Sequence, residues 1–498
     1  MPELSYLITY RNTGTDRQAG LTYVLNALAS LKRIEIILVE QDQVPKVSTK
    51  ILPGNCRYTF VHNHGKFNKS WGLNIAARQA KAQNLVMADA DILLTQEGFE
   101  KIISHFQNGA EAINPYTVLI DLSKCESQAL YEGNSRLHVE RTEQQINRIE
   151  RGCHTPFCGG VFALSAELYE QIGGLDERFE GWGAEDDAAS AKIAHFSKNA
   201  ATLTGAHAYH LWHTPVSYVD SKETPGYLRN RALLSAYYEF GDDFYQNLAS
   251  HDFKLRGQTE KYISADPGQY KALKEPLVSC LCVTRARTDT LRQAINCFQQ
   301  QTHQHRELII VCEDDDKETL QFTSALSAPS IKVCIVPANP KLALGSLRNI
   351  AIANAKGEYI CQWDDDDWYH PRRIELQLKS AVDQNKAASI LPRWLIYSPA
   401  DHKAYCSNVR LWEGSLLCET RLLRNGPGYP ALSRGEDTAL ISWLYVQDQL
   451  AIEDRPDLYL YRFSGNNTWN NQHFERILEA STELDDSDTE RVFSMVSG

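Results

Sequence analysis

The pattern Asp-x-Asp occurs twice in this chain, each time directly after an apolar run. The acids are Asp89 and Asp91 in the first copy, and Asp364 and Asp366, extended by Asp365 and Asp367, in the second. Mg²⁺ and Mn²⁺ prefer oxygen ligands and are often held by one or two carboxylates together with substrate phosphates. Clustered carboxylates repel one another unless a cation neutralises them. The spacing therefore predicts a divalent cation at each copy, and a solvated acidic turn is the alternative for either copy alone.

Two other loops that bind cations or phosphates are excluded. A calcium loop of the EF-hand type requires glycine at its sixth position, where the second copy has Tyr369. The chain also has neither GxxxxGKS nor GxxxxGKT, so it contains no P-loop.

A second acidic pair follows each Asp-x-Asp further along the chain. The pairs are Glu185 with Asp186 in FEGWGAEDD, and Glu436 with Asp437 in SRGEDTAL. Glycines before the acids allow the backbone to approach a ligand closely, and the acids are placed to begin a helix. A carboxylate near a bound metal, but not bound to it, is suited to act as a general base on a hydroxyl group. Capping of a helix N-terminus stays open as the alternative role.

Histidines complete the first candidate site. The segment HAYHLWHTP contains His210 and His213, and we expect one of them, preferably His213, to be a third metal ligand beside Asp89 and Asp91. A zinc site is not expected, because Cys153 and Cys158 lack CxxC spacing and no second pair accompanies them.

The elements that must position these residues are duplicated as well. Residues 74–91 and 349–366 align without a gap, and seven of the eighteen positions are identical, which indicates duplication of a whole domain. Apolar runs predict strands, and amphipathic runs predict helices between them, at 4–12, 21–31 and 34–42 in the first half and at 277–285, 291–300 and 307–315 in the second. This pattern predicts an α/β fold, with two tandem domains of mostly parallel sheet and ligand sites at the carboxyl ends of the strands.

The order of these segments also predicts the domain boundaries. We expect a first domain at residues 1–235, a polar and partly helical linker at 236–275, a second domain at 276–475, and a polar tail at 476–498 that is a short helix or a frayed end. With 43% apolar residues, each half has enough core to fold alone.

The composition indicates which classes of binding partner and which cellular compartment to expect. The formal charge of −12 disfavours nucleic acid and anionic lipid, which require basic surfaces. The chain does not begin with a secretory signal, and no apolar run approaches the ~20 residues that span a bilayer. Several of the twelve cysteines lie within predicted strands, which is typical of reduced thiols. We expect a soluble cytoplasmic protein; docking at the inner face of a membrane and the oligomeric state stay open.

The motifs resemble those of known enzymes. VSCLCVTR, RNIAIANAKGEYICQWDDDDWYHP and GEDTAL, within residues 276–475, resemble family 2 glycosyltransferases of the GT-A fold. FCGGVFALSAELYEQIGGLDERFEGWGAEDDAAS is similar to the C-terminal region of β-1,4-galactosyltransferases and to the N-acetylhexosamine-transferring half of chondroitin-type polymerases. The resemblance implies a nucleotide-sugar donor, commonly a UDP-sugar, whose diphosphate is held through Mn²⁺ or Mg²⁺.

The resemblance also implies roles for individual residues. Asp89 and Asp91, and likewise Asp364 and Asp366, would bind the metal and the ribose. Asp186 beside Glu185, and Asp437 beside Glu436, would orient and deprotonate the acceptor hydroxyl, and Trp182 would stack on the acceptor sugar unless it is a core residue. The positions expected to contact the nucleotide or its diphosphate are Tyr10, Arg11, Arg17, Glu40, Thr284, Arg285, Glu313 and Arg348. The first half has Leu73 at the position of Arg348, and we expect Lys69 to serve instead.

One position departs from the family pattern. The sequence YRFSGNNTW has Ser464 where the family often has a histidine, and His473 is the candidate to replace it. The resemblance implies a bifunctional, inverting glycosyltransferase that adds two sugars to a bacterial surface glycan of the capsule or lipopolysaccharide type. A single active module beside an inactive one, and a glycan-binding scaffold on degenerate GT-A folds, stay open as alternatives.

Overall fold

The computed structural model describes residues 2–133, 146–147, 157, 159–214, 224–262, 275–399, 401–462 and 471–497. Contacts divide the chain into two compact units. Unit 1 comprises Met1–Asn230 with Gly241–Gln269, and unit 2 comprises Arg231–Phe240 with Tyr270–Gly498. Ser464, Cys153 and Cys158 lie outside the described residues, as does the side chain of His473.

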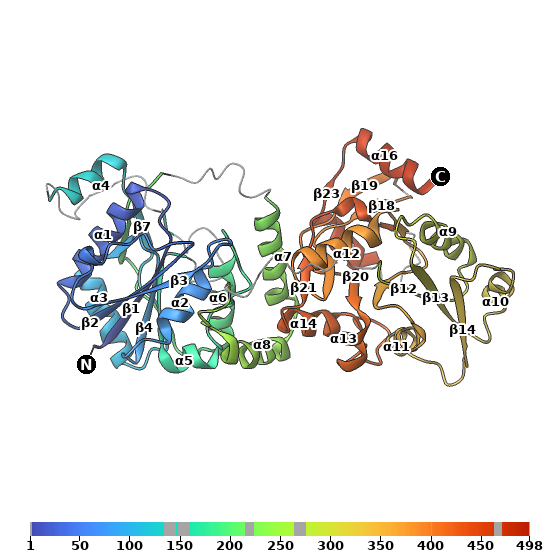
Figure 1. The fold of residues 1–498 in the computed structure, drawn as a ribbon, viewed down its shortest axis with the longest axis horizontal. Coiled ribbons are helices and arrows are strands. Elements are labelled where there is room, and N and C mark those ends of the chain that lie inside the picture. The colour runs from blue at the N-terminus through green and yellow to red at the C-terminus, as the bar shows by residue number, and fades with distance from the viewer. Residues whose placement is uncertain are drawn as a thin grey trace. The chain divides into compact units, whose positions relative to one another are not determined.

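Unit 1 is built on a seven-stranded sheet (Figure 1). Its strands are parallel except for β9, which runs antiparallel to both of its neighbours. The order across the sheet is β10 (Ala200–Thr202), β6 (Ala112–Asn114), β9 (Val161–Ser165), β4 (Asn84–Ala88), β1 (Leu4–Tyr10), β2 (Ile34–Asp42) and β3 (Cys56–His62).

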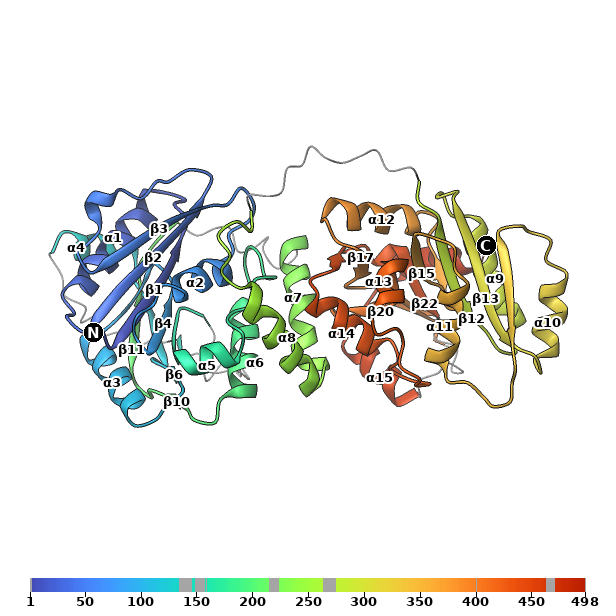
Figure 2. The ribbon, with the colours of Figure 1, turned by 60° about the horizontal axis from the view of Figure 1, so that its bottom comes forward.

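Helices cover both faces of this sheet, so its strands are apolar without alternation. Leu4, Tyr6 and Ile8 of β1 pack in one core with α1 and α3, whereas Leu7 packs in a second core with α2, α5 and α6. Figure 2 shows α1 and α2 on opposite sides of β1 and β2. The helices of unit 1 are α1 (Thr15–Ala29), α2 (Lys69–Ala77), α3 (Gln96–Gln107), α4 (Lys124–Tyr131), α5 (Ala166–Gln171), α6 (Glu185–Phe196) and α8 (Asp242–Leu255), with a 3₁₀ turn η1 (Thr49–Ile51).

Unit 2 repeats this plan. Its sheet has the same order of parallel strands and one antiparallel strand, β20. The strands are β14 (Ile331–Val336), β13 (Arg306–Glu313), β12 (Val278–Val283), β15 (Tyr359–Gln362), β20 (Trp412–Glu419), β17 (Ala388–Leu391) and β21 (Leu450–Ile452). The helices are α9 (Thr288–Gln299), α10 (Lys317–Ser324), α11 (Leu344–Asn354), α12 (Arg373–Asp383), α13 (Thr420–Asn425), α14 (Thr438–Val446), α15 (Asn471–Glu479) and α16 (Asp486–Ser497), with a 3₁₀ turn η3 (Pro456–Leu458).

Each unit also has a smaller sheet that flanks its Asp-x-Asp segment. In unit 1 the order is β5 (Ile92–Leu94), β11 (His207–His210), β7 (Val118–Asp121) and β8 (Ile146–Asn147). In unit 2 it is β16 (Trp368–Tyr369), β22 (Tyr459–Arg462), β18 (Leu395–Ser398), β19 (Lys403–Cys406) and β23 (Thr482–Glu483).

The predicted fold class, α/β with two mostly parallel sheets in tandem, is confirmed. The edge strands β3 and β14 were not predicted from the sequence, because most of their residues are only partly buried and lack a continuous apolar run. The predicted boundaries remain predictions: the segment expected as a linker contains α8, which belongs to unit 1, and α7 (Pro225–Glu239) has residues in both units. Among the described residues, no helix is long and apolar enough to cross a membrane.

Candidate active sites

In unit 1 one lysine joins the two acidic pairs that the sequence singles out. Lys69 is the first residue of α2, which Asn68 caps by accepting a hydrogen bond from the Trp71 backbone. Its Nζ lies 2.8 Å from Asp89 Oδ1, where β4 ends. The same Nζ donates to both carboxylate oxygens of Asp186, at 2.9 and 3.2 Å. The two predicted acidic groups therefore lie within the reach of a single ammonium group.

The electrostatics of this cluster are those of a buried, tightly paired site. Burial opposes the charge of Lys69, but Asp186, Asp89 and Glu185 together hold its pKa well above the ordinary value. Burial, followed by the charge of Asp186, raises the pKa of Glu185 to about 8. Near neutral pH Glu185 therefore favours its protonated form.

Neither acidic pair acts as a helix cap by hydrogen bonding. The N-cap of α6 is Ala184, with φ of 72°, and no side chain caps this helix. Asp437 is the N-cap residue of α14 and makes no capping hydrogen bond. The N-cap residues of α6 and α14 thus make no side-chain capping hydrogen bond, and the general-base role of the acidic pairs stays a prediction.

A candidate cation site lies beside this cluster in unit 1. One ligand atom each from Asp91, His210 and His213 lies within 4.8 Å of the others. His210 Nδ1 is 2.8 Å from Asp121 Oδ1, which orients the ring as second partners of metal-binding histidines do. Arg17 Nη1 lies 3.0 Å from Asp91 Oδ2. One carboxylate with two imidazoles is a ligand set for a divalent transition-metal ion. Asp89, which the sequence also predicts as a ligand, is not part of the group.

The other unit 1 residues with predicted roles are spread around this centre. Tyr10 is buried at the end of β1, and Arg11 donates to the backbone oxygens of Gln41 and Gly65, each at 2.9 Å. Glu40 is fully buried and accepts hydrogen bonds from the Lys46 backbone at 2.8 Å and from the Tyr58 hydroxyl at 2.5 Å. Trp182 is 46% exposed and stacks on Tyr227 with a centroid separation of 5.2 Å, so it is not a core residue.

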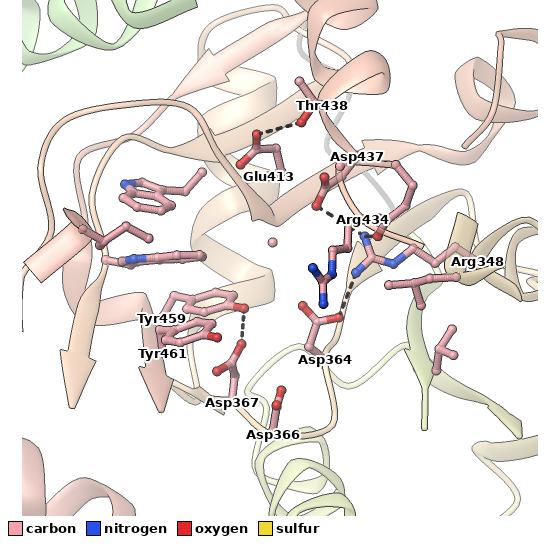
Figure 3. Close-up of a pocket in the computed structure, with 18 of the residues that line it drawn as sticks. Arg348, Asp364, Asp366, Asp367, Glu413, Arg434, Asp437, Thr438, Tyr459 and Tyr461 are labelled. Atoms are coloured by element: carbon pink, nitrogen blue, oxygen red, sulfur yellow. Dashed lines mark hydrogen bonds and ion pairs between the residues drawn. The ribbon is translucent and has the colours of Figure 1, made fainter. Parts of the chain in front are cut away.

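In unit 2 the corresponding groups line one cavity of about 450 Å³ (Figure 3). Arg348 of α11 is the cation that joins them: its guanidinium lies 3.2 Å from Asp364, 3.0 Å from Glu436 and 3.5 Å from Asp437. The opposing charges of Asp364 and Asp437 raise the pKa of this buried arginine despite the cost of burial. Burial also raises the pKa of Glu436.

The four consecutive aspartates of unit 2 are crowded and largely buried. Burial and the charge of Asp366 raise the pKa of Asp365 to about 7, and burial holds the pKa of Asp367 well above its ordinary value. Asp365 accepts a 2.6 Å hydrogen bond from Thr284, and Asp367 accepts one from the Tyr459 hydroxyl. Such crowding favours a bound cation, which fits the prediction, although no Asp/His group like that of unit 1 forms among the described residues of unit 2.

Two features of this cavity were not predicted from the sequence. Arg287, which the sequence analysis did not single out, contacts the aspartates, at 2.8 Å from Asp366. Arg285 instead pairs with Glu313 and with Asp315, the latter at 2.9 Å. The other feature is Glu413 of β20, which lies near Thr438 (Figure 3). Its neighbours in sequence, WEGSLL, form no acidic pattern, so only its place in the fold reveals it.

Comparisons with known proteins confirm the predicted resemblance to glycosyltransferases. The family model described as "Glycosyl transferase family 2" matches residues 7–173 and 279–435, and one described as "N-terminal domain of galactosyltransferase" matches residues 135–214. Hyaluronan synthase of Pasteurella multocida is 24% identical over 474 residues, which are 88% of this chain and 44% of that protein. Chondroitin synthase of Pasteurella multocida strain Pm70 is 26% identical over 308 residues, 59% of this chain and 26% of that protein.

The chain thus spans less than half the length of these two relatives. Among solved structures, S. aureus TarS 1-349 in complex with UDP-GlcNAc matches with a TM-score of 0.35 and 14% identity, over 51% of this chain and 72% of that chain.

Proposed function

The chain belongs to glycosyl transferase family 2, and from this premise we propose that it is a bifunctional inverting glycosyltransferase with one active site in each unit. The observation that carries the proposal is that each unit brings the first aspartate of its Asp-x-Asp and its second acidic pair together around one cation. The cation is Lys69 in unit 1 and Arg348 in unit 2. One group of acids faces the donor diphosphate, and the other faces the acceptor hydroxyl.

The reaction follows from this arrangement. Asp186, or Asp437 in unit 2, takes the proton of an acceptor hydroxyl. The hydroxyl oxygen forms a bond to the anomeric carbon of the donor while the bond from that carbon to the diphosphate breaks. Because there is one displacement, an α-linked donor gives a β-glycoside. Asp186 is paired with Lys69 but, as a carboxylate, has further lone pairs with which to accept the proton.

A divalent cation, Mn²⁺ or Mg²⁺, would offset the charge that develops on the leaving diphosphate. Asp91 with His210 and His213 would hold it in unit 1, and Asp364 and Asp366 would hold it in unit 2. Lys69 and Arg348 supply fixed positive charge at the same place. The donors are nucleotide sugars, most simply UDP-sugars. Arg17 and Arg287 contact Asp91 and Asp366, two of the acids proposed to hold the cation, and Thr284 contacts the neighbouring Asp365.

The product is a bacterial surface glycan built from two alternating or successive sugars. The names of the relatives, hyaluronan synthase and chondroitin synthase, support a polysaccharide, and the presence of two acid-lined centres supports two transfers. The described cysteines are free thiols, which supports a reducing compartment such as the cytoplasm. A single active module is the second candidate, since a histidine ligand is described only in unit 1.

Two substitutions in the full chain test the proposal. Asp186→Asn should abolish one of the two sugar transfers and spare the other, and Asp437→Asn should do the reverse. Transfer is followed with radiolabelled UDP-sugars and Mn²⁺ on an oligosaccharide acceptor, and Asp242→Asn on the exposed start of α8 serves as the control. If both single variants keep both transfers, separate active sites are excluded.

A further inference from the structure

A carboxylate that the proposed mechanism does not use lies in the cavity of unit 2. Glu413 lines this cavity together with Asp364 and Asp437. Arg410 donates to both of its oxygens, at 2.9 and 3.0 Å, and the Thr438 hydroxyl lies 3.5 Å away. Thr438 directly follows the proposed base, so Glu413 is held close to the reacting centre.

The chemistry fixes where the transferred sugar must lie. Its anomeric carbon is bonded to the diphosphate, which is held at Asp364, and is attacked by the hydroxyl activated at Asp437. The sugar ring therefore lies in the part of the cavity that both aspartates line, beside the Arg348 guanidinium that joins them. A Cβ placed on Gly414 would lie 3.6 Å from Asp364 Oδ2, so the backbone of β20 runs beside that space. Glu413 is the preceding residue; it also lines the cavity, and its carboxylate lies beside Thr438 (Figure 3).

A rigid aromatic wall supports this carboxylate. Trp412 and Trp394 stack with a centroid separation of 4.2 Å, and Trp394 stacks on Tyr459 at 4.7 Å. The Arg410 guanidinium lies 4.6 Å above the Trp412 ring, which fixes the group that holds Glu413. An aromatic surface beside a fixed hydrogen-bonding carboxylate is suited to bind a sugar ring, which has apolar C–H faces and hydroxyl edges.

The strand register identifies the equivalent position in unit 1. Asn84 pairs with Ser165 in unit 1, and Tyr359, its counterpart in the repeat, pairs with Glu419 in unit 2. Further along the strands, the Asp89 backbone N–H donates to the Gly160 oxygen in unit 1, and Gly414 lies beside Asp364 in unit 2. The residues before these glycines, Gly159 and Glu413, therefore correspond. The first site therefore has no side chain at the position where the second site has a carboxylate.

We propose that Glu413 is the residue with which the second site selects its donor sugar, by accepting a hydrogen bond from a ring hydroxyl of a neutral hexose. Gly159 leaves the first site without this contact, so the two sites select different sugars. The inference rests on the proposed function and adds the class of sugar to it. A buried acceptor discriminates strongly against a sugar that cannot pair with it, because the unpaired polar group is costly.

The test uses the full chain and a panel of UDP-hexoses and UDP-N-acetylhexosamines. Glu413→Gly copies the residue of the first site, and Glu413→Gln keeps the shape while removing the charge. Arg410 keeps a partner in both variants, because Glu239 lies 3.1 Å from it. Glu419→Gln, on the same strand but outside the cavity, is the matched control.

We expect Glu413→Gly to lower kcat/KM for the preferred donor of the Asp437-dependent transfer by about 10- to 100-fold. Other donors should change by less, so the order of preference shifts, while the Asp186-dependent transfer and the control variant stay as in the wild type. An equal loss for every donor, or an unchanged preference, would overturn the inference.

Failure of the proposed function gives a different result, namely that no transfer depends on Asp437. Calorimetric binding of the same donors then decides the inference by itself. Selection by Glu413 requires that Glu413→Gly weaken binding of the preferred UDP-sugar while binding of UDP stays unchanged. If UDP and the UDP-sugar are affected alike, or neither is affected, Glu413 does not select the sugar.

Discussion

Lys69 donates from one ammonium group to both carboxylate oxygens of Asp186, at 2.9 and 3.2 Å. Arg348 makes the corresponding contact to Asp437 in unit 2, at 3.5 Å. The two cations are not at equivalent positions, because the repeat aligns Arg348 with Leu73, four residues after Lys69. Positions four apart on a helix lie on the same face. The two units therefore place the positively charged residue one helical turn apart, although it contacts equivalent acids in each.

Removal of Lys69 should damage both the stability and the chemistry of unit 1. In Lys69→Met, three carboxylates lose the charge that they share, and loss of one partner from a buried ion pair costs about 3 kcal/mol. Denaturant unfolding should show a loss of this size, and the Asp186-dependent transfer should disappear. Lys101→Met is the control, because Lys101 pairs with Glu97 on an exposed surface. Unchanged stability and transfer in Lys69→Met would contradict a shared charge at this centre.

Binding of Mn²⁺ to the candidate cation site of unit 1 should depend on His213. His213→Ala removes one of three ligand groups. Because loss of a residue that only orients a ligand already costs about 10-fold or more, we expect binding of Mn²⁺ to unit 1 to weaken by at least about 10-fold. Electron paramagnetic resonance of the full chain titrated with Mn²⁺ measures this change. His207→Ala, at the exposed start of β11, should leave the titration unaltered. Equal titrations for the two variants would place the cation elsewhere.

In unit 2, Arg287 and the cation should compete for Asp366. Its guanidinium lies 2.8 Å from Asp366, where the cation is expected. In Arg287→Ala, Mn²⁺ no longer competes with this group, so its affinity in the absence of nucleotide should rise several-fold. Arg285→Ala is the matched control, because Arg285 contacts Glu313 and Asp315 instead. Calorimetry with Mn²⁺ alone tests this, and an unchanged or lower affinity in Arg287→Ala would contradict it.

The raised pKa of Glu413 should make the stability of the protein depend on pH. Burial raises the pKa of Glu413 to about 7, from an ordinary value of 4.5, although Arg410 opposes the shift. A carboxyl group with a raised pKa stabilises the fold below its unfolded pKa, and this contribution is lost as the pH rises through about 7. The unfolding midpoint of Glu413→Gln should therefore rise relative to wild type between about pH 5 and pH 8. A difference between the two midpoints that is constant over this range would contradict the shift.

Much of the fold could be predicted from the sequence, because buried parallel strands are continuous apolar runs and the duplication gives each element a second example. Runs such as IEIILVEQD and ELIIVCEDD correspond to β2 and β13. The edge strands β3 and β14 could not be predicted, since half-exposed strands lack that pattern.

The candidate sites were predictable where acids are clustered in sequence. Asp89 with Asp91 and Glu185 with Asp186 are such clusters. The fold brings Asp89, Glu185 and Asp186 to Lys69, and Asp91 to His210 and His213. Residues that reach a site alone, from a strand or loop distant in sequence, carry no local signal. Arg287 and Glu413 are of this kind, and only strand register and side-chain contacts identify them.

Each unit should bind one nucleotide diphosphate through its own aspartates and a divalent cation. Calorimetric titration of the full chain with UDP in the presence of Mn²⁺ measures the number of such sites. We expect two equivalents of UDP for the wild type, one for Asp91→Asn, one for Asp366→Asn, and none when both aspartates are changed. A single equivalent in the wild type, or a single variant that loses both equivalents or neither, would contradict it.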